Sequence, residues 1–108
     1  MRSKYNAKPT VVDGIRFASM AEARRYGELK LLERAGKIDS LELQPKFVLT
    51  VNGVKVATYV ADFKYHAGAW SKPSPWIVED VKGMKTPVYK LKKRMVEAQY
   101  GIVIQEVQ

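Results

Sequence analysis

The sequence predicts an α/β fold, with helices packed against a mixed central sheet, and three observations support this prediction. The expected elements follow the order hairpin, helix, three strands, helix, strand, which suits a sheet covered by helices. The length of 108 residues is that of one domain. The hydrophobic content of 46% is normal for a folded core. We therefore expect a single domain over residues 11–108, preceded by a flexible basic arm over residues 1–10.

Turn and cap residues set the expected limits of the first elements. Asp13-Gly14 and Asn52-Gly53 each lie between apolar segments, and both dipeptides favour two-residue hairpin turns. Ser19 followed by Glu22 has the form of a capping box, which predicts a helix that begins at Ser19. Gly36 supplies the expected end of this helix.

The middle of the chain predicts three strands, at residues 41–49, 54–65 and 76–82. Pro45 in the first of them suggests an edge or a bulge. In the second, Tyr59, Ala61, Phe63 and Tyr65 alternate with Val60, Asp62, Lys64 and His66, so the two sets are expected on opposite faces.

A second helix is expected from Pro87 to about Tyr100, with Gly101 as its cap. A final strand should cover residues 102–107, and a helix between two strands fits a crossover that joins parallel strands. The apolar stripe of this helix is expected to comprise Val88, Leu91, Met95 and Ala98, widened by Tyr89, Val96 and Tyr100.

The charge of the chain favours a polyanionic partner. The formal net charge is +8 and the pI is near 9.8. The basic residues cluster in two acid-free segments, which predicts a phosphate-binding surface. The expected DNA-binding residues are Arg2, Lys4, Lys8, Lys85, Lys90, Lys93 and Arg94.

The composition also excludes several classes of protein. The chain has no cysteine, which rules out a disulfide scaffold, a thiolate metal site and a thiol nucleophile. No apolar run approaches the ~20 residues of a membrane span, and the basic start lacks the apolar stretch of a secretory signal. We expect a cytoplasmic protein with no membrane partner.

Two acidic strand segments predict a divalent-metal site. Asp62 lies in one expected strand, and Glu79-Asp80-Val81-Lys82 lies in the next. Asp80 and Lys82 should point the same way because strand side chains repeat every two residues. Two or three carboxylates suffice for Mg²⁺, with Mn²⁺ as a substitute. The alternative is that these acids lie on an exposed face or pair with lysines.

Three further residues are candidates for the same site. Glu22 shares a helical stripe with Tyr26 and Leu29, so it should face inward as a metal ligand or a water-positioning group, although capping alone would explain it. Lys82 would orient the attacking water or stabilise charge in the transition state, and the alternative is a solvated strand-end lysine. If the strand is bulged, Glu79 could replace Asp80.

Two polar residues interrupt the apolar stripe of the second helix. Lys92 falls inside the apolar arc, with Gln99 almost above it. Lys92 either reaches the site or the phosphate as a catalytic residue, or packs its stem on the sheet and extends its amine to water. Gln99 is a weaker candidate for a metal ligand or a residue behind the ligands.

Together these residues resemble the PD-(D/E)XK nuclease superfamily: Asp62 followed by Asp80-Val81-Lys82 has the D…(D/E)-x-K form, and Glu22 matches an acidic residue that many members carry on the preceding helix. The chain also resembles a small family of phage and prophage endonuclease-like proteins, similar to Holliday-junction resolvases. The matching segments are residues 3–8, 19–26, 43–47, 59–63, 78–83 and 89–102. Unlike the named pattern, Asp62 follows Ala61 rather than a proline, and Asp80 replaces the more usual glutamate.

The resemblance implies a restriction-endonuclease-like αβββαβ core, Mg²⁺-dependent phosphodiester hydrolysis and often a homodimer. We therefore expect a metal-dependent DNA endonuclease that acts on branched or structured DNA in phage DNA processing, with the catalytic residues Glu22, Asp62, Asp80, Lys82 and Lys92. The alternatives are a non-catalytic nucleic-acid-binding module on a nuclease-like fold and an accessory phage protein whose charge aids assembly.

Overall fold

The computed structural model describes residues 8–68, 76–82 and 85–108. Most of the expected basic arm, with Arg2 and Lys4, lies outside the described residues. The elements in chain order are β1 (Thr10–Val12), β2 (Ile15–Phe17), α1 (Met20–Arg34), β3 (Asp39–Leu43), β4 (Lys46–Val51), β5 (Val54–Val60), β6 (Phe63–His66), β7 (Trp76–Val81), α2 (Pro87–Tyr100) and β8 (Ile104–Val107).

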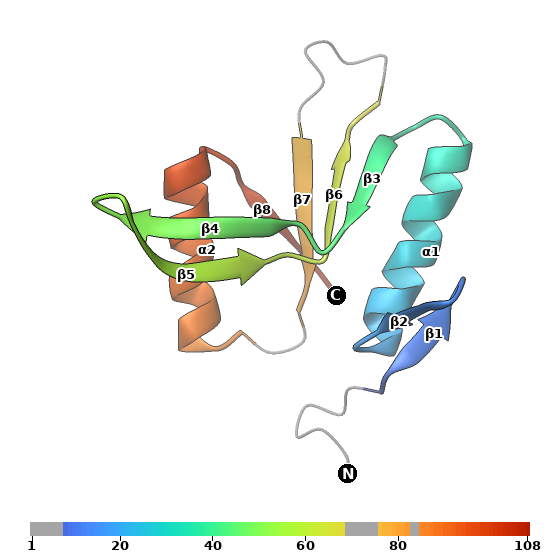
Figure 1. Cartoon of the computed structure of the whole chain (residues 1–108). Helices are drawn as coiled ribbons and strands as arrows, with labels where there is room; N and C mark the ends of the chain where they lie inside the picture. The colour runs from blue at the N-terminus through green and yellow to red at the C-terminus, as the bar shows by residue number, and fades with distance from the viewer. Residues whose placement is uncertain (1–7, 69–75, 83–84) are drawn as a thin grey trace.

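The central sheet has the strand order β3-β6-β7-β8. Its first two pairings are antiparallel, and β7 and β8 run parallel on either side of α2 in the chain. Figure 1 shows α1 on one side of this sheet, and α2 with the β4–β5 hairpin on the other. The predicted α/β architecture with a mixed sheet and parallel strands around the second helix is therefore confirmed.

Two separate cores follow from this layering. One core lies between the sheet, α2 and the β4–β5 hairpin, and it includes Tyr59, Ala61, Val78 and Val96. The other lies between the sheet, α1 and the β1–β2 hairpin. It comprises Phe17, Ala23, Tyr26, Leu29, Ile38, Phe63 and Tyr65. Each face of the sheet is thus covered, which explains why β7 carries side chains buried on both faces.

Two of the expected strands are each broken into two. Residues 41–49 form β3 and β4, separated by Gln44, whose φ is 52°, and Pro45. Residues 54–65 form β5 and β6, separated at Ala61 and Asp62. The backbone N–H of Gln44 donates to the Asp62 carbonyl at 2.9 Å, and that of Ala61 donates to the Pro45 carbonyl at 3.1 Å. These bonds hold the two breaks side by side.

The break at Asp62 corrects the predicted alternation of faces. Tyr59 and Ala61 belong to the core on the α2 side, whereas Phe63 and Tyr65 belong to the core on the α1 side. All four side chains are buried, as expected, but they do not share one face. The chain crosses from one side of the sheet to the other because its strand geometry is interrupted at Asp62.

The buried face of α2 also differs from the expected one. Tyr89 and Val96 are buried, but Val88 and Leu91 are 62% and 60% exposed. The helix lies against β4 and β5, and its side chains face that hairpin and β8 rather than follow the most hydrophobic stripe. Packing against neighbouring elements therefore decided that Tyr89 and Val96 are buried rather than Val88 and Leu91.

The predicted turns and caps are confirmed. Asp13-Gly14 and Asn52-Gly53 have positive φ at both residues, as two-residue hairpin turns require. The Ser19 hydroxyl caps α1, Thr86 caps α2 in front of Pro87, and Gly101 ends α2 in the left-handed conformation. The last strand begins at Ile104, two residues later than expected. Among the described helices, none has the length and apolar character needed to cross a membrane.

Candidate carboxylate–lysine site

Asp62 lies at the break between β5 and β6, next to the end of β7. Its backbone N–H donates to the Glu79 carbonyl at 3.1 Å. Its Oδ2 atom accepts from the backbone N–H of Val81 at 2.7 Å. These two bonds fix both the backbone and the carboxylate of Asp62 against β7.

Asp80 is buried beside it on the α2 side of the sheet, with only 1% of its surface exposed. The Tyr59 hydroxyl donates a hydrogen bond to Asp80 Oδ2. Within the described residues, Asp80 Oδ1 has no hydrogen-bond partner, although Lys82 Nζ forms an ion pair with it at 3.4 Å. Burial and the bond to Asp80 raise the pKa of Tyr59, so this hydroxyl keeps its proton as a donor.

Lys82 follows Asp80 with the predicted spacing and on the same side. Its Nζ atom lies 4.7 Å from the centre of the Tyr89 ring, so the ammonium group is held between an aromatic face and a carboxylate. Asp80 and Lys82 thus point the same way, as predicted, and they form the ion pair that the sequence analysis gave as the alternative to a metal site.

Glu22 faces the site from α1. It is buried together with Tyr26 and Leu29, as their shared helical stripe predicts. Its Oε2 atom accepts from the backbone N–H of Ala18 at 3.1 Å, rather than from Ser19 as in a standard capping box. The Ser19 hydroxyl accepts from the Glu22 N–H in the expected way.

The three carboxylates interact through Asp62. Burial is the largest of the causes that together raise the pKa of Asp62 to about 9, and the neighbouring Glu22 and Asp80 carboxylates also raise it. The charged form of Asp62 is thus disfavoured first by loss of water and then by nearby acids. In the part of the chain that the structure describes, no three His, Asp or Glu side chains form a ready-made metal-binding group.

Two of these acids have features of metal ligands. Asp80 Oδ1 is a buried oxygen without a hydrogen bond, and because the pKa of Asp62 is raised, a nearby cation would favour its charged form. Carboxylate oxygens are the ligands that Mg²⁺ prefers. The Asp62 and Asp80 carboxylates, with Glu22, are the residues that could hold it.

Glu79 points to the opposite face of β7. Arg25 of α1 donates to its two carboxylate oxygens at 2.7 and 2.6 Å, and the Tyr65 hydroxyl donates to one of them as well. Asp80, and not Glu79, therefore lies beside Lys82. The sequence analysis missed Arg25, whose only signal was its position three residues after Glu22 on the same helix.

Lys92 and Gln99 occupy different surroundings. Lys92 Nζ lies 3.4 Å from the Thr58 carbonyl. It lines a depression of about 250 Å³ together with Lys82, Tyr59 and Tyr89, and both readings of Lys92 given by the sequence analysis stay predictions. Gln99 instead bonds to the backbone of β4, at Val48 and Thr50. It contacts none of the three carboxylates, and its expected role as a ligand is not what the structure shows.

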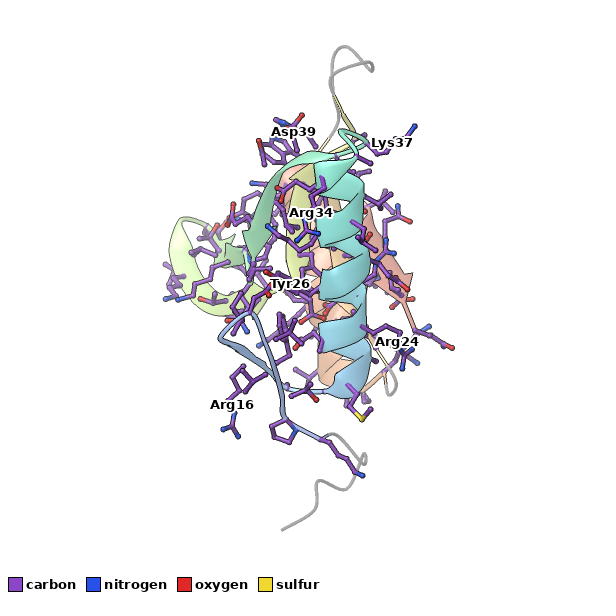
Figure 2. The ribbon with its side chains drawn as sticks, turned by 90° about the vertical axis from the view of Figure 1, so that its right-hand side faces the viewer. Arg16, Arg24, Tyr26, Arg34, Lys37 and Asp39 are labelled. Atoms are coloured by element: carbon purple, nitrogen blue, oxygen red, sulfur yellow. The ribbon has the colours of Figure 1, made fainter. Side chains whose placement is uncertain are left out.

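The basic residues of the expected DNA-binding set are of two kinds. Lys85 and Lys93 pair with Glu106, at 3.1 and 3.9 Å, which partly neutralises them. Lys8, Lys90 and Arg94 are exposed and are not engaged with Glu106. Further cations that the sequence analysis did not single out lie along α1 and beyond its end. They are Arg24, Arg34 and Lys37 (Figure 2).

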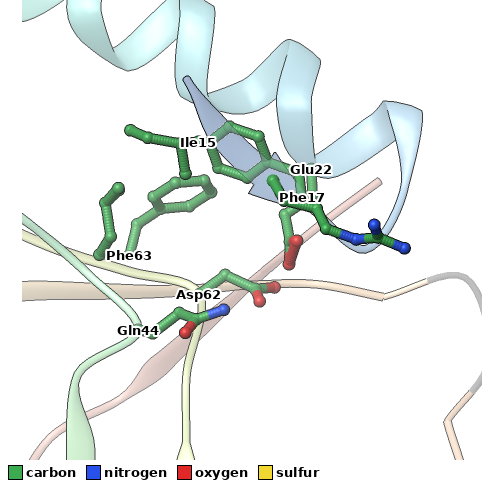
Figure 3. A pocket seen from close by; sticks show the side chains of 8 residues that line it. Ile15, Phe17, Glu22, Gln44, Asp62 and Phe63 are labelled. Atoms are coloured by element: carbon green, nitrogen blue, oxygen red, sulfur yellow. The ribbon is translucent and has the colours of Figure 1, made fainter. Parts of the chain in front are cut away.

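A second hollow adjoins the carboxylates on the α1 side. It encloses about 220 Å³ and is lined by Phe17, Phe63, Glu22, Asp62 and neighbouring residues (Figure 3). It shares no lining residue with the lysine-lined depression. One hollow is thus lined by the Glu22 and Asp62 side chains, and the other by Lys82, which pairs with Asp80.

Fold and site together define a small α/β protein with buried carboxylates beside a lysine at the end of a central strand. The family model described as "Protein of unknown function (DUF1064)" matches residues 2–107, and the chain belongs to this family. No curated protein and no solved structure matches the chain.

Proposed function

We propose that this protein is a metal-dependent DNA endonuclease that hydrolyses phosphodiester bonds, with the carboxylate–lysine site as its active site. The observation that carries the proposal is the Asp80 carboxylate: it is buried, one of its oxygens has no hydrogen bond, and it forms an ion pair with Lys82. The pKa of the neighbouring Asp62 is raised. Perturbed acids next to a fixed cation are typical of catalytic sites.

The topology supports the same proposal. The order α1, β3, β6, β7, α2, β8 fits the αβββαβ core that the resemblance to PD-(D/E)XK nucleases implies. Asp62 precedes β6, and Asp80 lies near the end of β7. The inserted β4–β5 hairpin separates β3 from β6 in the chain and supplies Tyr59, which orients Asp80.

In the proposed site, Asp62, Asp80 and Glu22 would hold Mg²⁺. When bound, this ion would supply the Lewis-acid charge on which phosphodiester hydrolysis depends. Lys82 would place its ammonium group where negative charge develops on the phosphate oxygens. Lys92 lines the same depression and would bind an adjoining part of the phosphate backbone.

Cleavage of linear, flapped and four-way DNA in Mg²⁺ tests the proposal. Asp80→Asn should lower the rate by a factor of about 100 or more, because removal of one charge-stabilising group typically has this effect. Glu42→Gln, an exposed acid on β3, is the matched control and should cleave at the wild-type rate. Equal rates for the wild type and Asp80→Asn would exclude the proposed site.

The second candidate is a non-catalytic DNA-binding module. It is favoured by the lack of a ready-made group of three metal ligands among the described residues. Titration calorimetry with Mn²⁺ separates the two functions. An endonuclease requires a binding isotherm that Asp62→Asn abolishes, whereas a binding module requires salt-sensitive DNA binding with no metal site.

A further inference from the structure

The hollow on the α1 side has one apolar wall and one polar wall. It lies between the β1–β2 hairpin, the first turn of α1 and the two strand breaks. Ile15, Phe17, Leu43 and Phe63 supply apolar surface, and Glu22, Asp62 and Gln44 lie opposite (Figure 3). Its volume of about 220 Å³ is below the ~300 Å³ of the smallest drug-sized pockets. It therefore suits a single flat ring system.

The charges around the hollow decide which part of a nucleic acid can enter it. Glu22 would repel a phosphate group at this side. Arg16, which also lines the hollow, is exposed, and its side chain extends away from the molecule (Figure 2). A nucleobase is uncharged, and its faces can contact apolar side chains while its edges form hydrogen bonds. The exposed Gln44 side chain carries both a donor and an acceptor at the polar wall. The apolar wall and Glu22 thus make the hollow more suitable for a base than for a phosphate.

The opposite hollow has the complementary character. Lys82 and Lys92 line it. Lys82 forms an ion pair with Asp80, and Asp62 accepts a hydrogen bond from the backbone of Val81, which lies between these two residues in the chain. A nucleotide bound across the carboxylates would thus have cations on the side of its phosphate and apolar surface on the side of its base.

We propose that the hollow on the α1 side receives one unpaired nucleobase of the DNA, next to the bond that is cleaved. This inference rests on the proposed function and specifies which DNA feature it recognises. A base in a duplex must leave its stack to enter such a pocket, whereas an unpaired base has lost part of that stabilisation already. Selectivity for flaps, bulges and junctions follows without any reading of base sequence.

The test uses DNA that carries the fluorescent base 2-aminopurine at one unpaired position, in metal-free buffer so that the strand stays intact. Stacking within DNA quenches this base, so its fluorescence should rise severalfold when the protein takes it into the hollow. A fully paired duplex with the same label should show no comparable rise. Moving the label along the unpaired segment should give the signal at a single position, adjacent to the bond that is cleaved in Mg²⁺.

A pocket-filling variant provides the second arm. Ile15→Phe combined with Leu43→Phe should narrow the hollow, abolish the fluorescence rise and weaken binding of the unpaired DNA about tenfold, as loss of contact with one base does. Val11→Phe, on the same hairpin at a position that is 66% exposed, is the matched control and should behave as the wild type. Thermal denaturation verifies that both proteins are folded.

The outcomes separate the inference from the function on which it rests. Cleavage of branched DNA without any position-specific fluorescence rise would overturn the pocket and leave the endonuclease in place. Unchanged binding by a folded pocket-filling variant would have the same meaning. If the filled variant does not fold, the label scan on the wild-type protein decides alone. Failure of the wild type to bind any DNA would overturn both.

Discussion

At the residue scale, Asp80 is a buried carboxylate that the neighbouring side chains hold in position. Its Oδ2 atom accepts from Tyr59, whereas Oδ1 faces Lys82 without a hydrogen bond. A buried polar atom that lacks a partner lowers the stability of the folded state. The proposed cation would complete the surroundings of this atom.

The raised pKa of Asp62 predicts how stability depends on pH. In the folded, metal-free protein this carboxyl holds its proton up to about pH 9, whereas its ordinary pKa is 3.8. Between these values the folded state binds more protons than the unfolded state, so the free energy of unfolding should fall as the pH rises. Asp62→Asn keeps an oxygen for the Val81 N–H and carries no charge, so it should reduce this fall.

Thermal denaturation in a chelating buffer measures the effect. At pH 8 the melting temperature of Asp62→Asn should exceed that of the wild type by several degrees, which corresponds to about 1 kcal/mol for a domain of this size. At pH 4 the difference should largely vanish. Added Mg²⁺ should then stabilise the wild type and not the variant. Identical pH profiles for the two proteins would contradict the raised pKa of Asp62.

At the element scale, the contact between α1 and β7 is held by a buried ion pair. Glu79 is 2% exposed, and Arg25 binds both of its oxygens. The same helix carries Glu22, and the same strand carries Asp80. The ion pair on the α1 face of β7 therefore fixes the two elements that supply carboxylates to the site.

Removal of Arg25 should destabilise the protein strongly. Arg25→Met leaves the Glu79 charge buried with only Tyr65 as a donor, which should cost about 3–5 kcal/mol of unfolding free energy. Arg25 also pairs with Glu28, whose side chain is 53% exposed. Glu28→Gln is thus the control and should cost at most about 1 kcal/mol. Urea denaturation compares the variants, and similar losses for both would show that the buried pair does not hold α1 to β7.

At the scale of the whole molecule, the positive charge is not uniform. Lys85 and Lys93 are engaged with Glu106, whereas Lys90 and Arg94 are exposed on α2. Counterion release makes DNA affinity depend on salt in proportion to the number of phosphates that a protein neutralises. Lys90 and Arg94, which are not engaged with Glu106, should therefore contribute most to the salt dependence of DNA affinity.

Neutralisation of Lys90 and Arg94 tests whether the DNA lies along α2. The double variant Lys90→Gln with Arg94→Gln should reduce the slope of log affinity against log salt by about 2, because each phosphate contact contributes roughly 0.9. The control is Arg34→Gln with Lys37→Gln, which removes the same charge at the C-terminal end of α1 and just beyond it (Figure 2). Equal changes in slope would show that binding follows net charge alone.

The sequence by itself determined the elements that depend on local chemistry. Asp13-Gly14, Asn52-Gly53, Ser19 and Gly101 specify turns and caps through their own backbone preferences and hydrogen bonds, and all of them are in the structure as expected. The two-residue period of a strand likewise placed Asp80 beside Lys82. Local rules suffice where the deciding contacts lie within a few residues.

Only the tertiary structure decided which side chains meet across the sheet. Arg25 and Glu79 are 54 positions apart, and no local pattern marks them as partners. The buried face of α2 followed from its contacts with the β4–β5 hairpin, against the stronger apolar stripe. The break at Asp62 divided one alternating segment into β5 of the hairpin and β6 of the central sheet, because hydrogen bonds to Gln44 and Glu79 hold the chain at that point. Long-range hydrogen bonds and packing thus placed the acid of β5–β6 within reach of those on α1 and β7.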